Sequence, residues 1–99
     1  MYVIRDVMNC KPGKVGEMVK KFKALNELAP QLGIKASRIL TDVSGAPFWT
    51  VVAILEVESL DQFFALMQKA GANEDARKIM AGYHDLVQSG HREIYKLEG

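Results

Sequence analysis

The sequence predicts an α+β domain in which helices cover one face of a four-stranded antiparallel sheet. Two stretches rich in apolar and β-branched residues, MYVIRDVMNC at the start and FWTVVAILEV at 48–57, have the composition of strands. Each is followed by a segment whose apolar residues recur with helical spacing. A chain of 99 residues has room for one such core, so residues 1–99 are expected to form a single domain.

The first half of the chain predicts a strand, a helix and a second strand. KPGK (11–14) ends the first strand, because Pro and Gly interrupt regular structure. In the helix that follows, apolar side chains share one stripe, namely Val15, Met18, Val19, Phe22, Leu25 and Ala29. Pro30 and Gly33 are expected to end this helix. The next stretch, GIKASRILTDV, has the partial alternation of a strand.

The second half predicts a strand, two helices and a closing strand. SGAP (44–47) has turn chemistry and leads into the strand at 48–57. SLDQ (59–62) has the pattern of a capping box, with Ser at the N-cap and Gln three residues later. Asn73 is expected to cap a third helix. Gly90 is expected to end that helix, and HREIYKL (91–97) supplies the last strand.

The order β-α-β-β-α-(α)-β is the split βαβ arrangement of the ferredoxin-like fold, in which the first and third strands are central. The third strand is apolar on both faces, with Val51, Ala53 and Leu55 on one side and Val52 and Ile54 on the other. The helices can cover only one of these faces. A second copy of the sheet is the simplest cover for the other face, so the sequence predicts a homodimer.

Composition excludes several classes of partner. The net charge of +1 argues against a dedicated nucleic-acid binder. No apolar stretch approaches the roughly 20 residues that span a bilayer, so no membrane partner is expected. Cys10 is the only cysteine, which favours a reducing, cytoplasmic location. No His or Cys motif has metal-ligand spacing and no Gly-rich phosphate loop is present, so neither a metal nor a cofactor is expected.

A family resemblance is carried by the element order, by PGKVGEMVKKF after the first strand, by FWTVVAILEVESLDQFFALM and by the closing GHREIYKL. Together these passages resemble the dimeric α/β-barrel superfamily. The PGK…E start of the first helix is most similar to NIPSNAP-type and related uncharacterised small proteins. The resemblance implies a dimeric α/β barrel. It does not imply one chemistry, because the superfamily includes cofactor-independent monooxygenases, haem-degrading monooxygenases and isomerases.

The adjacent charges Arg5 and Asp6 must point to opposite faces of the first strand. Asp6 shares its face with Ile4 and Met8, which the resemblance places in the cavity between the sheet and the helices. Arg5 shares the other face, and with it the predicted dimer interface, with Val3 and Val7. Either charge needs a partner if it is buried.

The sequence predicts a ligand pocket with apolar walls and a few polar groups. Its expected walls are Phe22, Trp49, Phe63, Met67 and Tyr83, and its expected polar groups are Asn26, Asp6 and His84. Asp6 and His84 are the candidate catalytic acid–base residues. A structural carboxylate at Asp6, a half-exposed His84 and a plain apolar core are the alternative interpretations.

Two functions from different classes follow. The first is a small dimeric protein that binds an apolar or aromatic ligand between sheet and helices, as a cofactor-independent monooxygenase or isomerase. The alternative is a non-enzymatic dimeric interaction or ligand-binding module, for which the lysine cluster at positions 11–23 would suit an acidic partner. Haem degradation is disfavoured. Its Asn and Trp positions, as the resemblance aligns them, fall on Asp6 and Leu66, and His84 is only a loose match to its His.

Overall fold

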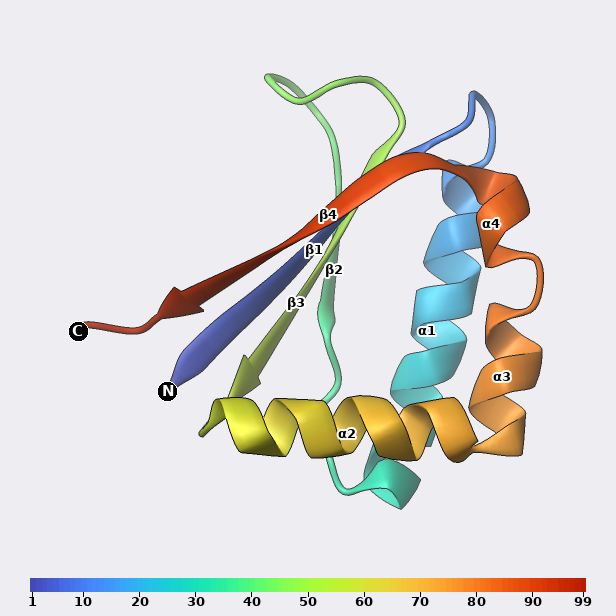
Figure 1. Cartoon of the computed structure of the whole chain (residues 1–99). Helices are drawn as coiled ribbons and strands as arrows, with labels where there is room; N and C mark the ends of the chain where they lie inside the picture. The colour runs from blue at the N-terminus through green and yellow to red at the C-terminus, as the bar shows by residue number, and fades with distance from the viewer.

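The structure, a computed structural model, describes residues 1–99 and has an α+β ferredoxin-like fold, as the sequence predicts (Figure 1). Its elements follow in the order β1 (Tyr2–Cys10), α1 (Val15–Leu32), β2 (Arg38–Thr41), β3 (Thr50–Val57), α2 (Leu60–Ala72), α3 (Glu74–Met80), α4 (Tyr83–Leu86) and β4 (Val87–Lys96). None of the helices combines the length and the apolar composition needed to cross a bilayer.

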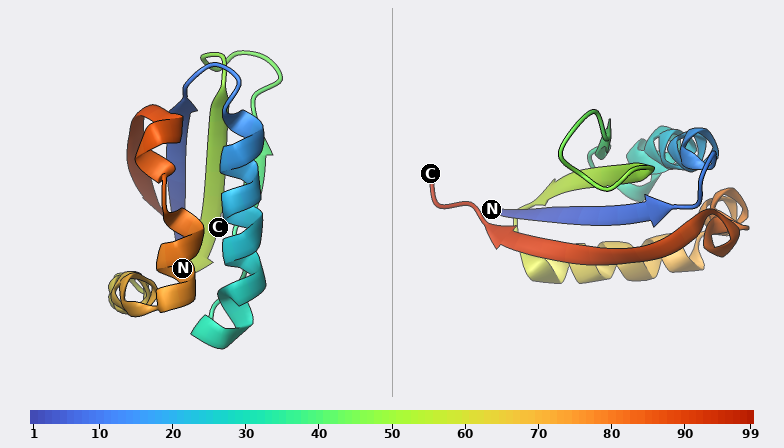
Figure 2. Two further views of the ribbon diagram at one scale, coloured as in Figure 1. Left: turned by 90° about the vertical axis from the view of Figure 1, so that its right-hand side faces the viewer. Right: turned by 90° about the horizontal axis from the view of Figure 1, so that it is seen from above.

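The four strands form one open antiparallel sheet in the order β2-β3-β1-β4. β1 is therefore central, and its residue Asp6 lies opposite Ala53 on β3 and Arg92 on β4. Helices α1, α2 and α3 lie on one side of the sheet, and the opposite face is left uncovered (Figures 1 and 2). We call this uncovered surface the open face. It carries the odd-numbered β1 residues Val3, Arg5, Val7 and Asn9 with their cross-strand partners.

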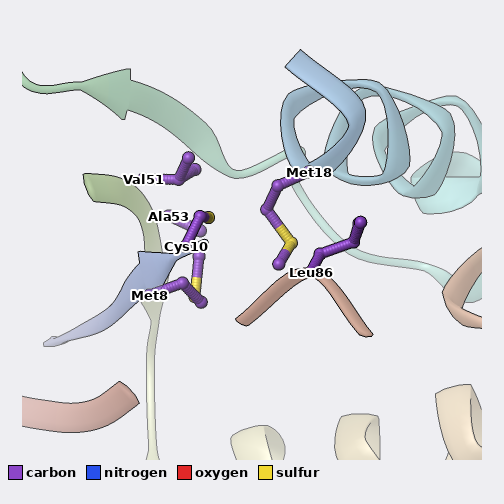
Figure 3. Packing of buried hydrophobic residues seen from close by; sticks show 6 residues of the cluster. All are labelled: Met8, Cys10, Met18, Val51, Ala53 and Leu86. Atoms are coloured by element: carbon purple, nitrogen blue, oxygen red, sulfur yellow. The ribbon is translucent and has the colours of Figure 1, made fainter. Parts of the chain in front are cut away.

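Two separate apolar clusters join the helices to the sheet. In the larger one, Met18 of α1 points towards β1 and β3, where it meets side chains that include Met8 and Val51 (Figure 3). The smaller cluster joins Phe63 of α2 to Ile4 and Val57. On the helix-facing side of β1 the two clusters are separated by a single inward position, which is occupied by Asp6. The core is thus interrupted at this carboxylate.

The helix caps have the chemistry that the sequence predicts. The Ser59 hydroxyl accepts a hydrogen bond of 3.1 Å from the backbone N–H of Gln62, whose side chain accepts one of 2.8 Å from the N–H of Glu58. The Asn73 side chain accepts a hydrogen bond of 2.9 Å from the N–H of Ala76, at the start of α3. These bonds satisfy backbone donors that a helix leaves free at its N-terminus.

Two predicted boundaries are wrong. Pro30 lies inside the last turn of α1 and does not end it. The predicted end at Gly33 is confirmed, because Gly33 is the C-cap after Leu32 and its φ of 71° is the left-handed conformation that favours glycine. Gly90 lies within β4 and does not end a helix, because β4 begins at Val87. A Cβ at position 90 would lie 3.0 Å from the Val7 carbonyl oxygen. Close strand pairing with β1 therefore favours glycine at this position.

Candidate functional site

A cavity of about 650 Å³ lies beside the interruption of the core, between the sheet and helices α1, α2 and α3. Its walls are mostly apolar, with Phe22 from α1, Met67 and Ala70 from α2 and Met80 from α3. The elements that form it come from distant parts of the sequence and meet because α2 and α3 cross the same sheet face as α1 (Figure 1). Polar side chains reach the cavity mainly from β1, β4 and α3.

A charge pair forms the sheet side of the cavity. Arg92 donates from Nε to Asp6 Oδ1 at 2.6 Å and from Nη2 to Asp6 Oδ2 at 3.2 Å. Its guanidinium carbon also lies 5.0 Å from the centroid of the Phe63 ring, a cation–π distance. The hydrogen bond to Asp6 raises the pKa of Arg92, although burial acts in the opposite direction. Asp6 is thus a compensated carboxylate with both oxygens occupied.

Tyr83 supplies a phenol to the same cavity. Burial raises the pKa of Tyr83, and the negative charge of Asp6 adds to this effect. The phenol therefore stays protonated at neutral pH and can donate a hydrogen bond. Its ring meets the ring of His84 edge-on, with centroids 5.3 Å apart, so His84 packs against the outer side of the cavity wall.

The structure brings four of the predicted site residues to the cavity, namely Asp6, Phe22, Met67 and Tyr83. It places the other four elsewhere. His84 is exposed, and Phe63 is buried in the smaller apolar cluster. The Asn26 amide accepts from the Ser37 N–H at 2.8 Å and donates to the Ser37 carbonyl at 2.9 Å, which fastens α1 to the segment before β2.

Trp49, the remaining predicted wall residue, lies just before β3 in the long loop after β2. It lines a separate hollow near Val15 and Phe48. Its φ of 67° is unusual for a bulky residue, and its carbonyl accepts a hydrogen bond of 2.8 Å from the N–H of Cys10. Burial raises the pKa of the Cys10 thiol, which keeps this cysteine protonated and unreactive.

Two charged cavity residues, Arg77 and Arg92, were not found from the sequence. The position of Arg92 opposite Asp6 could be predicted only if the register between the first and last strands were known. Arg77 lies in NEDARKIM, a charged stretch in which no pattern distinguishes a cavity-lining arginine from a solvated one. No group of three or more His, Cys, Asp or Glu side chains is arranged to hold a metal ion.

The open face carries its own polar network, centred on Glu93. Arg5 Nη1 donates to Glu93 Oε1 at 2.9 Å, and the Tyr95 hydroxyl donates to the same oxygen at 2.7 Å. His91 Nε2 lies 2.7 Å from Glu93 Oε2. These hydrogen bonds, first that from Tyr95 and then those from His91 and Arg5, lower the pKa of Glu93 to about 2. The charge of Arg5 is therefore compensated within its own chain.

Glu93 is expected to stabilise the fold above the pKa of the unfolded carboxyl, 4.5, and to lose this contribution as the pH falls towards about 2. Between pH 7 and pH 3 the wild type should therefore lose more of its free energy of unfolding than Glu93→Gln. Urea unfolding at both pH values and one protein concentration measures the difference. Glu98→Gln, at the exposed C-terminal end, serves as the control. The same pH dependence in wild type and Glu93→Gln would contradict the expectation.

Comparison with solved structures identifies the fold. A NIPSNAP family protein from Agrobacterium tumefaciens superposes with a TM-score of 0.81 at 19% identity, covering 96% of this chain and 90% of that one. An uncharacterised NIPSNAP domain protein from Burkholderia xenovorans gives 0.80 at 16% identity, with 98% and 94% covered. A Nitrosomonas europaea protein described as a candidate antibiotic biosynthesis monooxygenase gives a TM-score of 0.75 at 14% identity, with 100% of both chains covered.

The chain thus shares the ferredoxin-like fold of NIPSNAP family proteins and of monooxygenase-type proteins. No family model and no curated protein matches the sequence. At these identities the similarity establishes the fold and not the chemistry, because one fold serves many functions. The function must therefore be argued from the cavity and the open face.

Proposed function

We propose that this protein binds a small, largely apolar or aromatic molecule in the cavity between the sheet and its helices, and that it does so as a homodimer. The observation that carries the first part is the cavity itself. It interrupts an otherwise packed core, and its polar side is built from a compensated pair, Asp6 and Arg92. A volume of about 650 Å³ falls within the range of small-molecule sites.

The chemistry of the walls supports an apolar or aromatic ligand. Phe22, Met67 and Met80 offer apolar contacts, and methionine side chains adapt to irregular shapes. The Tyr83 phenol can orient a bound molecule by donating one hydrogen bond. A site of this kind gains binding free energy from the removal of apolar surface from water and specificity from its few polar groups.

The open face supports the homodimer. Leu40 on β2 lies opposite Val52 on β3, which in turn lies opposite Val7 on β1, so an apolar strip crosses three strands. Arg5 and Glu93 beside this strip already compensate each other, which lowers the cost of removing them from water. A second copy of the same face would meet this strip with an identical one, as a two-fold interface requires.

A catalytic role, as a cofactor-independent monooxygenase or isomerase, is the second candidate. The observation that favours it is a carboxylate, Asp6, in a largely apolar cavity beside the protonated phenol of Tyr83. Catalysis by Asp6 is less favoured than ligand binding, because Arg92 occupies both oxygens of Asp6. A substrate would have to displace this arginine before Asp6 could accept a proton. A cytoplasmic location fits Cys10, a buried cysteine without a disulfide partner.

Filling the cavity tests the binding role. Ala70 lines the cavity from α2, so the ring introduced by Ala70→Phe should occupy space that a ligand needs. We expect the affinity for the neutral aromatic probe N-phenyl-1-naphthylamine, measured by fluorescence titration, to fall by about tenfold or more. Ala65→Phe makes the same change at an exposed position of the same helix, away from the cavity, and should leave the affinity unchanged. Equal probe binding by both variants would refute the cavity as the site.

A further inference from the structure

We infer that the cavity selects a ligand that carries an oxyanion, such as a carboxylate or a sulfonate, on its largely apolar body, and that Arg77 binds this group. The inference rests on the proposed function, because it names the chemistry of the molecule that the same cavity takes. Its basis is the hydrogen bonding of the cavity wall, where the side-chain acceptors are already bonded within the protein and two side-chain donors are not.

The side-chain acceptors at the cavity are already engaged. Both carboxylate oxygens of Asp6 accept hydrogen bonds from Arg92. Ser89 and His91 also border the cavity, but they pair with Asn9 and Val7, so their side chains lie on the open face. There the Ser89 hydroxyl accepts a hydrogen bond of 3.1 Å from the Asn9 amide, and His91 Nε2 lies 2.7 Å from Glu93. A ligand that presents only hydrogen-bond donors therefore meets few free acceptors on this wall.

Free donors, in contrast, remain. Arg77 lines the cavity from α3, and its guanidinium forms no ion pair or side-chain hydrogen bond within the chain. Lys21, in contrast, is already bonded within the chain, because its ammonium group donates to the Ile79 and Ala81 carbonyls at 2.9 and 2.6 Å. The Tyr83 hydroxyl is a second donor without a partner in the chain, and burial keeps it protonated by raising its pKa.

The charges of the cavity wall also favour an anionic ligand. Two arginines, Arg77 and Arg92, face one aspartate, Asp6, so the wall has an excess of positive charge once the Asp6–Arg92 pair is counted as neutral. A planar guanidinium presents paired N–H donors that match an oxyanion in a bidentate geometry. An anionic ligand would therefore satisfy Arg77, which the protein itself leaves unpaired.

The test compares two probes that share one ring system. 1-Anilinonaphthalene-8-sulfonate is N-phenyl-1-naphthylamine with an added sulfonate, so the pair isolates the anionic group. We expect Arg77→Gln to weaken sulfonate-probe binding by about three- to fivefold while leaving the neutral probe unchanged, since charge-assisted hydrogen bonds of an exposed arginine have this order of strength. Arg77→Lys should restore part of the loss.

Lys78→Gln is the matched control, because Lys78 follows Arg77 on α3, lies outside the cavity and pairs with Glu74 at 3.6 Å. It removes the same charge from the same helix and should change neither affinity by more than about twofold. An equal loss in Lys78→Gln and Arg77→Gln, or none in Arg77→Gln, would overturn the role of Arg77. Titration of the neutral probe against Ala70→Phe tests separately whether the cavity is the binding site, so an error in the role of Arg77 can be told from an error in the proposed site.

Discussion

Replacement of Phe63 by Ala is expected to lower the free energy of unfolding by about 3–5 kcal/mol, the usual cost of removing a buried aromatic side chain. Phe63 is only 1% exposed and holds α2 against Ile4 and Val57 in the smaller apolar cluster. Its ring is also the surface over which the Arg92 guanidinium lies. The substitution therefore removes a core side chain and a contact of the cavity wall together.

Phe64 offers a matched control one residue along the same helix. Its side chain is 56% exposed, so Phe64→Ala is expected to cost less than about 1 kcal/mol. Urea unfolding of both variants beside the wild type measures the difference. Similar losses for the two substitutions would mean that α2 does not present position 63 to the sheet, and the position of the cavity beside it would then be wrong as well.

The assignment of strand faces is the part of the fold that the sequence predicted best. Alternation along β1 predicts that Asp6 and Arg5 point to opposite faces, because side-chain direction in a strand depends only on parity. The family resemblance predicts that Asp6 is the one that faces the helices, and the structure has this arrangement. Both caps, at Ser59 and Asn73, were also predictable because they are local hydrogen-bond patterns.

The partners of these charges could not be predicted, because they depend on the register between β1 and β4. A shift of one residue in that pairing would turn Arg92 away from Asp6 and towards the open face. The register is fixed in part by Gly90, which was predicted to end a helix and instead lets β4 approach the Val7 carbonyl. The cavity likewise depends on how α2 and α3 pack, and this is not encoded in any one segment.

If the protein is a homodimer, the substitution Leu40→Lys is expected to prevent the two copies from associating. Leu40 is 45% exposed on the open face, and in a two-fold dimer each copy would bring one such side chain into the interface. A lysine there places an unpaired ammonium group against apolar surface, at a cost of several kcal/mol. We expect the dissociation constant of the dimer to rise by more than about a hundredfold.

Sedimentation equilibrium measures this directly, and Ile94→Lys is its control. Ile94 has a similar exposure of 42% on the other edge strand, but it points to the helix side of the sheet, opposite Ile4. The wild type and Ile94→Lys should therefore sediment with twice the chain mass of 11.0 kDa, and Leu40→Lys with the chain mass alone. A wild type that stays at 11.0 kDa at high concentration would leave the Leu40 side chain, at the edge of the apolar strip, in contact with water. The two-fold interface would then be wrong, while the cavity on the opposite side of the sheet would be unaffected.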